Sequence, residues 1–344
     1  MNRITSLRIV GVIALLFALL ATESPAQDQS SGMTLRERLR ERMRQGGPAP
    51  AALTDVTAKI DKPGDYTFSF EHDGIQRSYR VHVPPSYNPA NPTPLLVSLH
   101  GGGGSMDYQA SDENYGQISK SNQAGFIVVF PNGFSRLPSG KLATWNAGNC
   151  CGPARDRNID DVGFIRQMVA NLERQLNIDR SKIFATGMSN GGLMAQRLAC
   201  EMSDTFKAIA PVAGTDNTKS CNPTNPVSVL EFHARNDDHL PFNGGMGKKS
   251  LGSAVTNFTS VPETISRWVQ RDSCNPAPKR VLERPGVYCE RYSQCRGGTV
   301  VELCVTDTGA HSWPGAGRSR GEPPSNAISA NDAMWDFFMG RDVR

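Results

Sequence analysis

One serine of this chain stands in a context that could make it a nucleophile. Residues 187–191 read Gly-Met-Ser-Asn-Gly, after a short apolar segment and before a run of small and apolar residues. A Gly-x-Ser-x-Gly turn between a strand and a helix lifts the serine hydroxyl out of a sheet and places it at a helix N-terminus, where free N–H groups favour negative charge. The same letters also occur in ordinary glycine-rich turns, so Ser189 needs partners elsewhere in the chain.

A serine hydroxyl needs a base, and the base needs an acid that orients it. With this kind of turn the expected order along the chain is serine, then Asp or Glu, then His. The apolar residues 227–232 lead into a loop with Asp237 and Asp238. We expect Asp237 to be the acid, with Asp238 as its competitor, although a loop aspartate is often only a turn former. Residues 300–305 lead into a loop with His311, the expected base.

Attack on a carbonyl also requires stabilisation of the negative charge that forms on its oxygen. Two backbone N–H groups pointing at that oxygen supply it. One should belong to Asn190, which follows the serine, and the other to the glycine run after His100, where Gly101 and Gly102 are the candidates. A plain flexible turn is the alternative. A phosphate-binding loop is disfavoured because no Gly-Lys-Ser/Thr follows the run.

Other residues have weaker chemical signals. Trp145 and Trp313 could line a pocket for an acyl group, with core packing as an equal alternative. His100 and His233 both follow predicted strands, and we expect structural roles for them. The cysteines lack Cys-x-x-Cys spacing, so no metal site is predicted. The proposed chemistry needs no cofactor.

The pattern of the chain predicts an α/β fold: a mostly parallel sheet with helices on both faces, opened by an N-terminal antiparallel hairpin. Buried strands are expected from continuous apolar runs, and helices from apolar positions spaced three and four apart. The predicted strands are 65–71, 76–83, 94–99, 126–130, 183–185, 206–212, 227–232, 287–292 and 300–305, and the predicted helices are 160–177, the segment after Ser189, 262–271 and 331–338.

Three segments are expected along the 344 residues. Residues 1–26 read as a signal peptide, with Arg3 and Arg8 before an apolar run and Ala26 at the cleavage point, and an uncleaved anchor is the alternative. Residues 27–60 read as a helical spacer, with a basic amphipathic helix at 33–45, and a Gly/Pro linker. Residues 61–344 form the folded domain. We expect a secreted or periplasmic protein without a stable membrane span.

The net charge and the cysteines give two further expectations. The formal net charge is +4 and scattered, which argues against nucleic-acid binding. Eight cysteines after an export signal predict disulfides. Spacing does not fix their connectivity. The expected pairs are Cys200–Cys221, Cys274–Cys295, Cys289–Cys304, which would face each other on two strands, and the neighbours Cys150 and Cys151.

Four segments, in this order, carry a resemblance: LLVSLHGGGGS, GMSNGGLMAQRLACE, FHARNDDHLPFNGG and GAHSWPG. They resemble the secreted polyhydroxybutyrate depolymerase and feruloyl esterase family, an α/β-hydrolase group, and WNAGNCCG is similar as well. The resemblance covers residues 65–340 and implies nucleophile Ser189, acid Asp237 and base His311. Ala234 stands where the family usually has Gly. Asn190 stands where some depolymerases have Ala, which favours the esterase branch.

We therefore expect a secreted serine carboxylic ester hydrolase that works through an acyl-enzyme. The ester could be a hydroxycinnamoyl ester on plant polysaccharide, a hydroxyalkanoate polyester or an acetyl ester. Two alternatives stay open: a non-catalytic carbohydrate-binding module on a hydrolase scaffold, and a serine peptidase of the same fold. The sequence makes no prediction of the oligomeric state.

Overall fold

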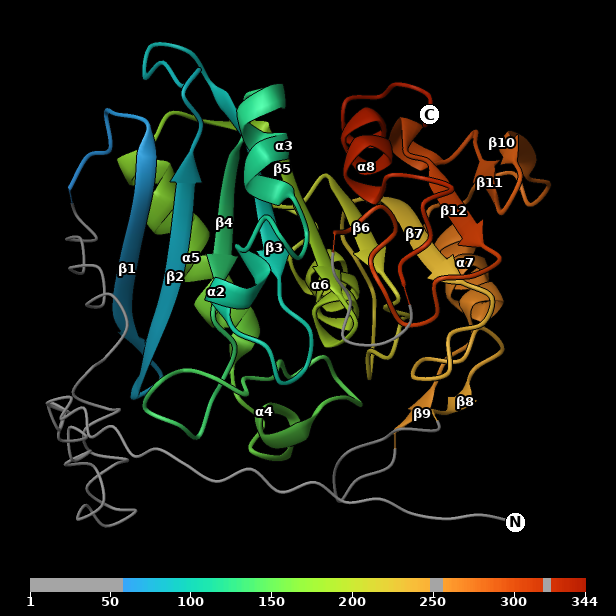
Figure 1. Ribbon diagram of the computed structural model, residues 1–344, viewed down its shortest axis with the longest axis horizontal. Helices are drawn as coiled ribbons and strands as arrows, with labels where there is room; N and C mark the ends of the chain where they lie inside the picture. The colour runs from blue at the N-terminus through green and yellow to red at the C-terminus, as the bar shows by residue number, and fades with distance from the viewer. Residues whose placement is uncertain (1–57, 248–255, 318–322) are drawn as a thin grey trace, which may run out of the picture. The chain divides into compact units, whose positions relative to one another are not determined.

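The structure is a computed structural model that describes residues 58–247, 256–317 and 323–344 (Figure 1). The predicted signal peptide and the basic helix at 33–45 lie outside the described residues. The described part belongs to one compact unit, residues 52–344. The chain enters it at Ile60, which is buried and whose N–H donates to Gln175 O at 3.0 Å.

A ten-stranded sheet forms the centre of this unit, in the order β1-β2-β4-β3-β5-β6-β7-β12-β11-β10. A separate two-stranded sheet pairs β8 with β9. The strands are β1 Gly64–His72, β2 Ile75–Val83, β3 Thr93–Leu99, β4 Ile127–Pro131, β5 Ile178–Met188, β6 Ala208–Val212, β7 Ser228–Ala234, β8 Gly245–Met246, β9 Asn257–Phe258, β10 Lys279–Arg284, β11 Val287–Tyr292 and β12 Val301–Thr306.

The sheet opens with an antiparallel hairpin of β1 and β2. Asp73 and Gly74 connect the two strands and have φ of 51° and 70°. Positive φ at both positions is the type I′ turn whose twist matches that of a hairpin, and Asp-Gly is a preferred pair for it. The predicted N-terminal hairpin is therefore confirmed.

The six central strands, from β4 to β12, run parallel. Strands β4 and β6 are buried at every residue, as expected for strands covered on both faces. In a parallel arrangement the carboxyl ends of the strands meet at one edge of the sheet, where the sites of open α/β folds gather. The loops after β3, β5, β7 and β12 therefore share that edge, and they carry Gly101, Ser189, Asp237 and His311.

Helices cover both faces of the sheet (Figure 1). Their buried residues fall into two large apolar clusters, one for each face. Helices α5 Asp161–Gln175, α6 Asn190–Glu201 and α7 Val261–Arg271 pack on one face, and α3 Gln117–Ala124 and α8 Ala330–Phe338 pack on the other. Three short elements complete the set: α2 Met106–Gln109, α4 Gly152–Asp156 and the 3₁₀ turn η2 Arg296–Gly298.

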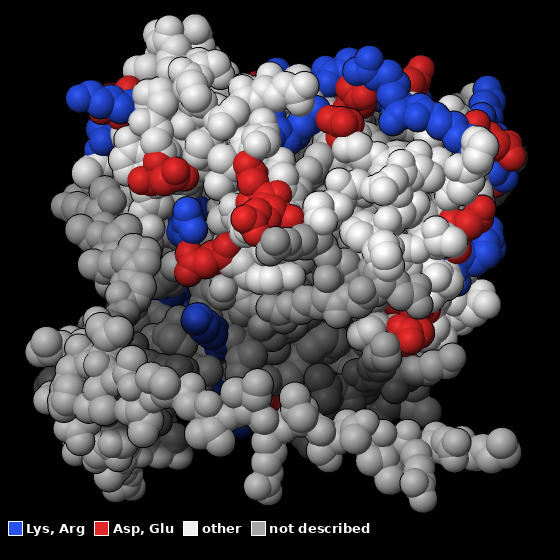
Figure 2. All heavy atoms as spheres, in the orientation of Figure 1, with Lys and Arg blue, Asp and Glu red and all other residues white. Residues whose placement is uncertain are grey.

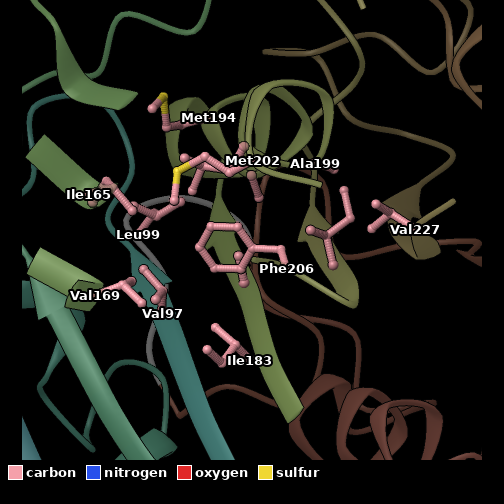
Figure 3. Packing of buried hydrophobic residues seen from close by; sticks show 14 of the residues in the cluster. Val97, Leu99, Ile165, Val169, Ile183, Met194, Ala199, Met202, Phe206 and Val227 are labelled. Carbon is pink, nitrogen blue, oxygen red and sulfur yellow. The ribbon is translucent and has the colours of Figure 1, made fainter. Parts of the chain in front are cut away.

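Figure 3 shows the core under α5 and α6. Phe206 is fully buried and lies near side chains of β3 and β5, here Val97 and Ile183. Ile165 and Val169 of α5 lie beside Leu99 and Val97 of β3. These α5 positions belong to the apolar stripe that the sequence predicts. This packing holds α5 and α6 against β3 and β5. The carboxyl ends of these two strands lead to the candidate site.

The antiparallel pair of β11 and β12 is confirmed, but the sequence did not predict β10. β10 pairs with β11 at the edge of the sheet and reads Lys-Arg-Val-Leu-Glu-Arg. Its residues are exposed or half-buried. Because the strand buries no complete apolar face, it lacks the alternation by which strands are recognised. Helices α2, α3 and α4 also carry no clear apolar period and were not predicted.

All eight cysteines are paired, as the sequence predicts: Cys150–Cys151, Cys200–Cys221, Cys274–Cys295 and Cys289–Cys304. Cys289 and Cys304 are opposite residues in the β11–β12 register, which explains their pairing.

Charges of both signs occur together on the face seen in Figure 2, and no extended field of one sign covers its described residues. In the described ranges, every helix is too short or too polar to cross a bilayer.

Candidate active site

Ser189 lies at a strained turn between β5 and α6. Its φ of 57° and ψ of −121° are unusual for a residue with a side chain. Such strain costs about 1–3 kcal/mol and persists only where surrounding structure holds it. Here the Ser189 N–H donates to Val212 O of β6 at 2.9 Å. The turn places the hydroxyl at the start of α6.

The glycines on either side of Ser189 are required by close packing. A Cβ on Gly187 would lie 2.5 Å from the Gly191 carbonyl carbon. A Cβ on Gly191 would lie 2.2 Å from Leu99 O and 2.7 Å from His100 O. These neighbours are backbone atoms, which cannot move aside cheaply. The Gly-x-Ser-x-Gly spacing therefore fits a turn at which β5, the end of β3 and the start of α6 are in close contact.

Asp237 and His311 meet at the same edge. His311 Nδ1 lies 2.8 Å from Asp237 Oδ2, and the Asp237 side chain is fully buried. The other oxygen, Oδ1, accepts the N–H groups of His239 at 2.8 Å and Leu240 at 2.9 Å. Burial alone would raise the pKa of Asp237, but the hydrogen bond and charge of His311, the charge of His233 and the Leu240 N–H hold that pKa below its usual value. Asp237 is therefore an ionised acceptor for the His311 ring.

Asp238, the alternative acid, faces another residue. Its Oδ1 lies 2.8 Å from Nδ1 of His239, and its side chain is 34% exposed. The His239 ring stacks on the His311 ring with centroids 4.8 Å apart. Of the two aspartates, Asp237 is thus the one that the loop directs at His311, while Asp238 holds the ring that packs against it.

A cavity of about 130 Å³ opens at this edge of the sheet. Ser189 and His311 both line it, and so do Gly101 and Gly102. The other lining residues are Gly104, Tyr108, Tyr115, Met188, Ser312 and Trp313. No hydrogen bond joins the Ser189 hydroxyl to His311 among the described residues. Such bonds are often long in unliganded sites and tighten when substrate binds.

The glycine run contributes donors beside Ser189. The N–H of Gly103 donates to Ala143 O at 2.8 Å and that of Gly104 to Gly101 O at 2.9 Å. Gly101 and Gly102 have no such acceptor among the described residues. A Cβ on Gly101 would lie 3.6 Å from the Ser189 Cβ. Gly101 thus keeps its backbone close to Ser189 and Gly102 keeps its backbone close to Asn190, with both N–H groups still available.

His100 holds the glycine run in place through two hydrogen bonds of its ring. The ring is fully buried, its Nδ1–H donates to Gly101 O at 2.8 Å, and its Nε2 accepts the Gly133 N–H at 2.9 Å. Accepting at Nε2 requires a neutral ring. Burial lowers the pKa of His100 to about 4, in agreement. This is the structural role that the sequence analysis expects for His100.

The two predicted pocket tryptophans have different positions. Trp145 is fully buried, does not line the cavity, and donates from Nε1 to His100 O at 2.9 Å. Its backbone pairs with the Asn190 side chain: the Trp145 N–H donates to Oδ1 at 2.7 Å, and Nδ2 donates to Trp145 O at 3.0 Å. Trp145 therefore fastens the loop to α6. Trp313 does line the cavity, with the Tyr115 ring edge-on at 5.2 Å.

The sequence analysis missed several residues at the site. Tyr108, Tyr115, Met188 and Ser312 line the cavity, and Glu231 lies behind Asp237. The tyrosines follow the glycine run within sixteen residues, but no motif marks them. Glu231 interrupts an apolar strand, and a charge in such a run was the one signal available.

One cluster at the site has metal-ligand types, with ligand atoms of Asp237, Asp238 and His239 within 4.8 Å of one another. The ligand atoms of this cluster already take part in hydrogen bonds. Asp237 accepts from His311 and two backbone N–H groups, and His239 Nδ1 is bonded to Asp238. The arrangement fits a hydrogen-bonded loop better than a cation site.

Known proteins are similar to this chain over most of its length. "Feruloyl esterase B" of Piromyces equi is 30% identical over 242 residues, 69% of this chain and 42% of the relative, so the chain spans about two fifths of that protein. "Probable feruloyl esterase C" of Aspergillus clavatus is 34% identical over 269 residues, 76% of this chain and 83% of the relative. "Putative esterase NocK" of Nocardia uniformis is 29% identical and covers 78% of this chain and 80% of the relative.

The fold is shared with solved structures. The crystal structure of native sOPH matches 78% of this chain and 84% of its own with a TM-score of 0.50 and 18% identity, which supports the fold alone. A family model described as "Putative esterase" matches residues 74–288, more than half of the chain. The chain therefore belongs to this esterase family, and it is a carboxylic ester hydrolase of the α/β-hydrolase fold.

Proposed function

We propose that the protein hydrolyses its ester through a covalent acyl-enzyme, with Ser189 as nucleophile, His311 as base and Asp237 as the orienting acid. One observation carries the proposal: the strained Ser189 shares a cavity with His311, whose Nδ1 is held by the buried Asp237. That hydrogen bond leaves Nε2 of His311 to take the hydroxyl proton.

In the acylation step Ser189 Oγ attacks the ester carbonyl carbon and His311 takes its proton. The carbonyl oxygen becomes an oxyanion, which the N–H groups of Gly101 or Gly102 and of Asn190 stabilise. His311 then gives the proton to the leaving alcohol as the ester bond breaks. Water repeats the sequence on the acyl-enzyme and frees the acid.

For the substrate we propose an ester with an aromatic acyl group, a hydroxycinnamoyl ester of a plant polysaccharide. Tyr108, Tyr115 and Trp313 line the cavity beside Ser189, and aromatic rings favour edge-on and offset contacts with another ring. Relatives named feruloyl esterases point the same way. Short hydroxybutyrate oligomers and acetylated xylan are the competing substrates. A panel that includes methyl ferulate separates the three, and faster turnover of either competitor would refute the aromatic assignment.

The mechanism is tested by Ser189→Ala, assayed with a p-nitrophenyl ester. We expect a folded protein without hydrolysis, and a burst of p-nitrophenol from the wild type. Ser312→Ala is the matched control, since Ser312 lines the same cavity but its hydroxyl donates to Gly309 O. Activity in Ser189→Ala would reject the mechanism. Cleavage of amides but not esters would favour a peptidase, and glycan binding without any turnover would favour a binding module.

Export is the remaining part of the proposal. The N-terminal pattern predicts cleavage after Ala26, and the pairing of all eight cysteines suits an oxidising compartment. N-terminal sequencing of protein recovered outside the cytoplasm checks this, with Gln27 as the expected first residue. Recovery with Met1 intact would contradict it.

A further inference from the structure

A buried glutamate and histidine lie behind the acid of the proposed triad. Glu231 and His233 are two residues apart on β7, so their side chains point to the same face of the sheet. Both side chains are fully buried. Ionisable groups in a core are costly unless they are paired and hydrogen-bonded. The pair occupies space that two apolar residues would fill at lower cost.

Hydrogen bonds define the protonation of the pair. Nε2 of His233 lies 2.8 Å from Leu240 O and must carry a proton, because a carbonyl only accepts. Nδ1 lies 3.2 Å from Glu231 Oε1. Both carboxyl oxygens also accept N–H groups, Oε1 from Gly214 at 3.3 Å and Oε2 from Gln196 at 3.1 Å. Burial raises the pKa of Glu231, whereas these N–H contacts and the charge of His233 favour its ionised form. With an ionised Glu231, Nδ1 of His233 is protonated as well.

The proton-bearing Nε2 also faces the triad acid. It lies 3.5 Å from Asp237 Oδ2, the oxygen that His311 Nδ1 meets at 2.8 Å. Asp237 is thus placed between two imidazoles, one fully buried and one at the cavity. Leu240 ties the arrangement together: its N–H donates to Asp237 and its carbonyl accepts from His233.

The electrostatics of the core agree with a charged ring. Burial alone would lower the pKa of His233, but the hydrogen bond and charge of Glu231, the charge of Asp237 and the Leu240 carbonyl more than offset burial and raise that pKa. A positive His233 between two carboxylates leaves neither of them as an unpaired buried charge.

The described elements packed around the pair present neutral side chains to it, with cations one ring further away. Helix α6 presents the neutral Gln196, whose Oε1 accepts from Nε1 of Trp268 on α7. Beyond that ring lies Arg271, 4.8 Å from its centroid and paired with Asp216 at 2.8 Å. The Phe242 ring packs edge-on against His233 at 6.1 Å, and the Arg235 guanidinium lies 5.4 Å from the Phe242 centroid, so this ring separates that cation from His233. The titratable groups that face His233 are therefore Glu231 and Asp237, with His311 beyond.

We propose that Glu231 and His233 are positioning residues for the catalytic acid. Glu231 keeps His233 doubly protonated, and the positive ring keeps Asp237 ionised and its loop closed. The inference rests on the proposed roles of Asp237 and His311. It has one further consequence: the charge of His233 helps to hold the pKa of Asp237 below its usual value, so loss of that charge lets the coupled acid take up a proton at higher pH and moves the acid limb of activity up.

Glu231→Gln tests this through the pH dependence of kcat/KM for a p-nitrophenyl ester, followed at the isosbestic wavelength of p-nitrophenol. The variant keeps the shape of the side chain and removes its charge. We expect the acid limb to move up by about one pH unit, and kcat to fall about tenfold with KM within about twofold. Glu231→Asp retains the charge and should restore the limb.

Glu302→Gln is the matched control. Glu302 is a fully buried carboxylate on the neighbouring strand β12, paired with Arg291 at 2.7 Å and without contact to the triad. It should lower stability without moving the acid limb. A wild-type limb in Glu231→Gln, or an equal shift in Glu302→Gln, would overturn the proposal.

A second measurement does not depend on activity. Nitrogen-15 spectra of the Ser189→Ala protein at about pH 8, where a free imidazole is neutral, should show both ring nitrogens of His233 protonated. Loss of these signals in His233→Gln, or their shift in Glu231→Gln, assigns them. A neutral His233 ring would refute the inference. A wild-type protein that hydrolyses no ester would refute the proposed function and leave this result standing.

Discussion

Asn190→Ala tests the role of the Asn190 side chain separately from the role of its backbone N–H in the proposed oxyanion site. The backbone N–H of residue 190 is kept, and the Ala side chain fits the first turn of α6. What is lost is the amide that joins α6 to the loop at Trp145. Any effect on catalysis must therefore act through the position of that N–H and of the neighbouring glycine run.

The cost follows from the groups left behind. The Trp145 N–H loses its acceptor at 2.7 Å in a fully buried position. The Trp145 carbonyl keeps one donor, the Cys151 N–H at 3.0 Å. One orphaned buried donor costs about 1–3 kcal/mol. For the compact unit of residues 52–344 that corresponds to a fall in Tm of about 2–5 °C.

The expected kinetic effect is larger than the loss of stability suggests. Oxyanion donors act only within a narrow range of distance, and a displacement of about 1 Å can cost about a hundredfold in rate. We expect kcat on a p-nitrophenyl ester to fall about 10–100-fold with KM almost unchanged. The assay is steady-state hydrolysis, with Tm measured at one scan rate.

Asn146→Ala is the control for this prediction. Asn146 is buried in the same loop, and its Nδ2 donates to Ile159 O at 3.0 Å. It meets α6 only through its backbone carbonyl, which accepts from Arg197 at 2.6 Å and which the Ala variant keeps. It should lower Tm by a similar amount and leave kcat near that of the wild type. The reasoning is refuted if Asn190→Ala keeps kcat within about twofold, or if Asn146→Ala lowers kcat as much.

Two further predictions concern pH and disulfides. The folded-state pKa of His100 is lowered to about 4, so its contribution to stability is present above 6.5 and lost as pH falls toward 4. Between pH 7 and pH 5 the wild type should lose about 2 kcal/mol more than His100→Gln in urea unfolding; Asp272, whose pKa burial raises to about 6, acts in the opposite direction but equally in both proteins. An equal loss in the two proteins would contradict this. Replacing Cys289 and Cys304 by Ala opens a disulfide of sequence separation 15 and should cost about 3 kcal/mol, with kcat retained. Unchanged stability, or lost activity in the folded variant, would contradict this.

Much of the fold can be predicted from local pattern. Apolar runs ending in glycine-rich loops mark β3 and β5, and alternation marks β1 and β2. Each pattern arises because burial of one or both faces of a strand constrains residues that are neighbours along the chain. The edge strand β10 and the short helices lack that constraint, and only their pairing and packing partners define them.

The sequence by itself determined the order of the site: a serine between two glycines, then an aspartate loop, then a histidine loop, each after a strand of a parallel sheet. That order sufficed because parallel strands bring their carboxyl ends to one edge. It also limited the acid to Asp237 or Asp238. It did not distinguish Trp145 from Trp313 as residues that line the acyl pocket.

Tertiary structure alone decided between these alternatives. The N–H groups of His239 and Leu240 turn Asp237 toward His311, and the pairing of Trp145 with Asn190 draws that ring into the core. Tyr108 and Glu231 are recognised as residues of the site only from contacts between segments that are distant along the chain. Side-chain direction and burial depend on contacts across the fold, which spacing along the chain does not encode.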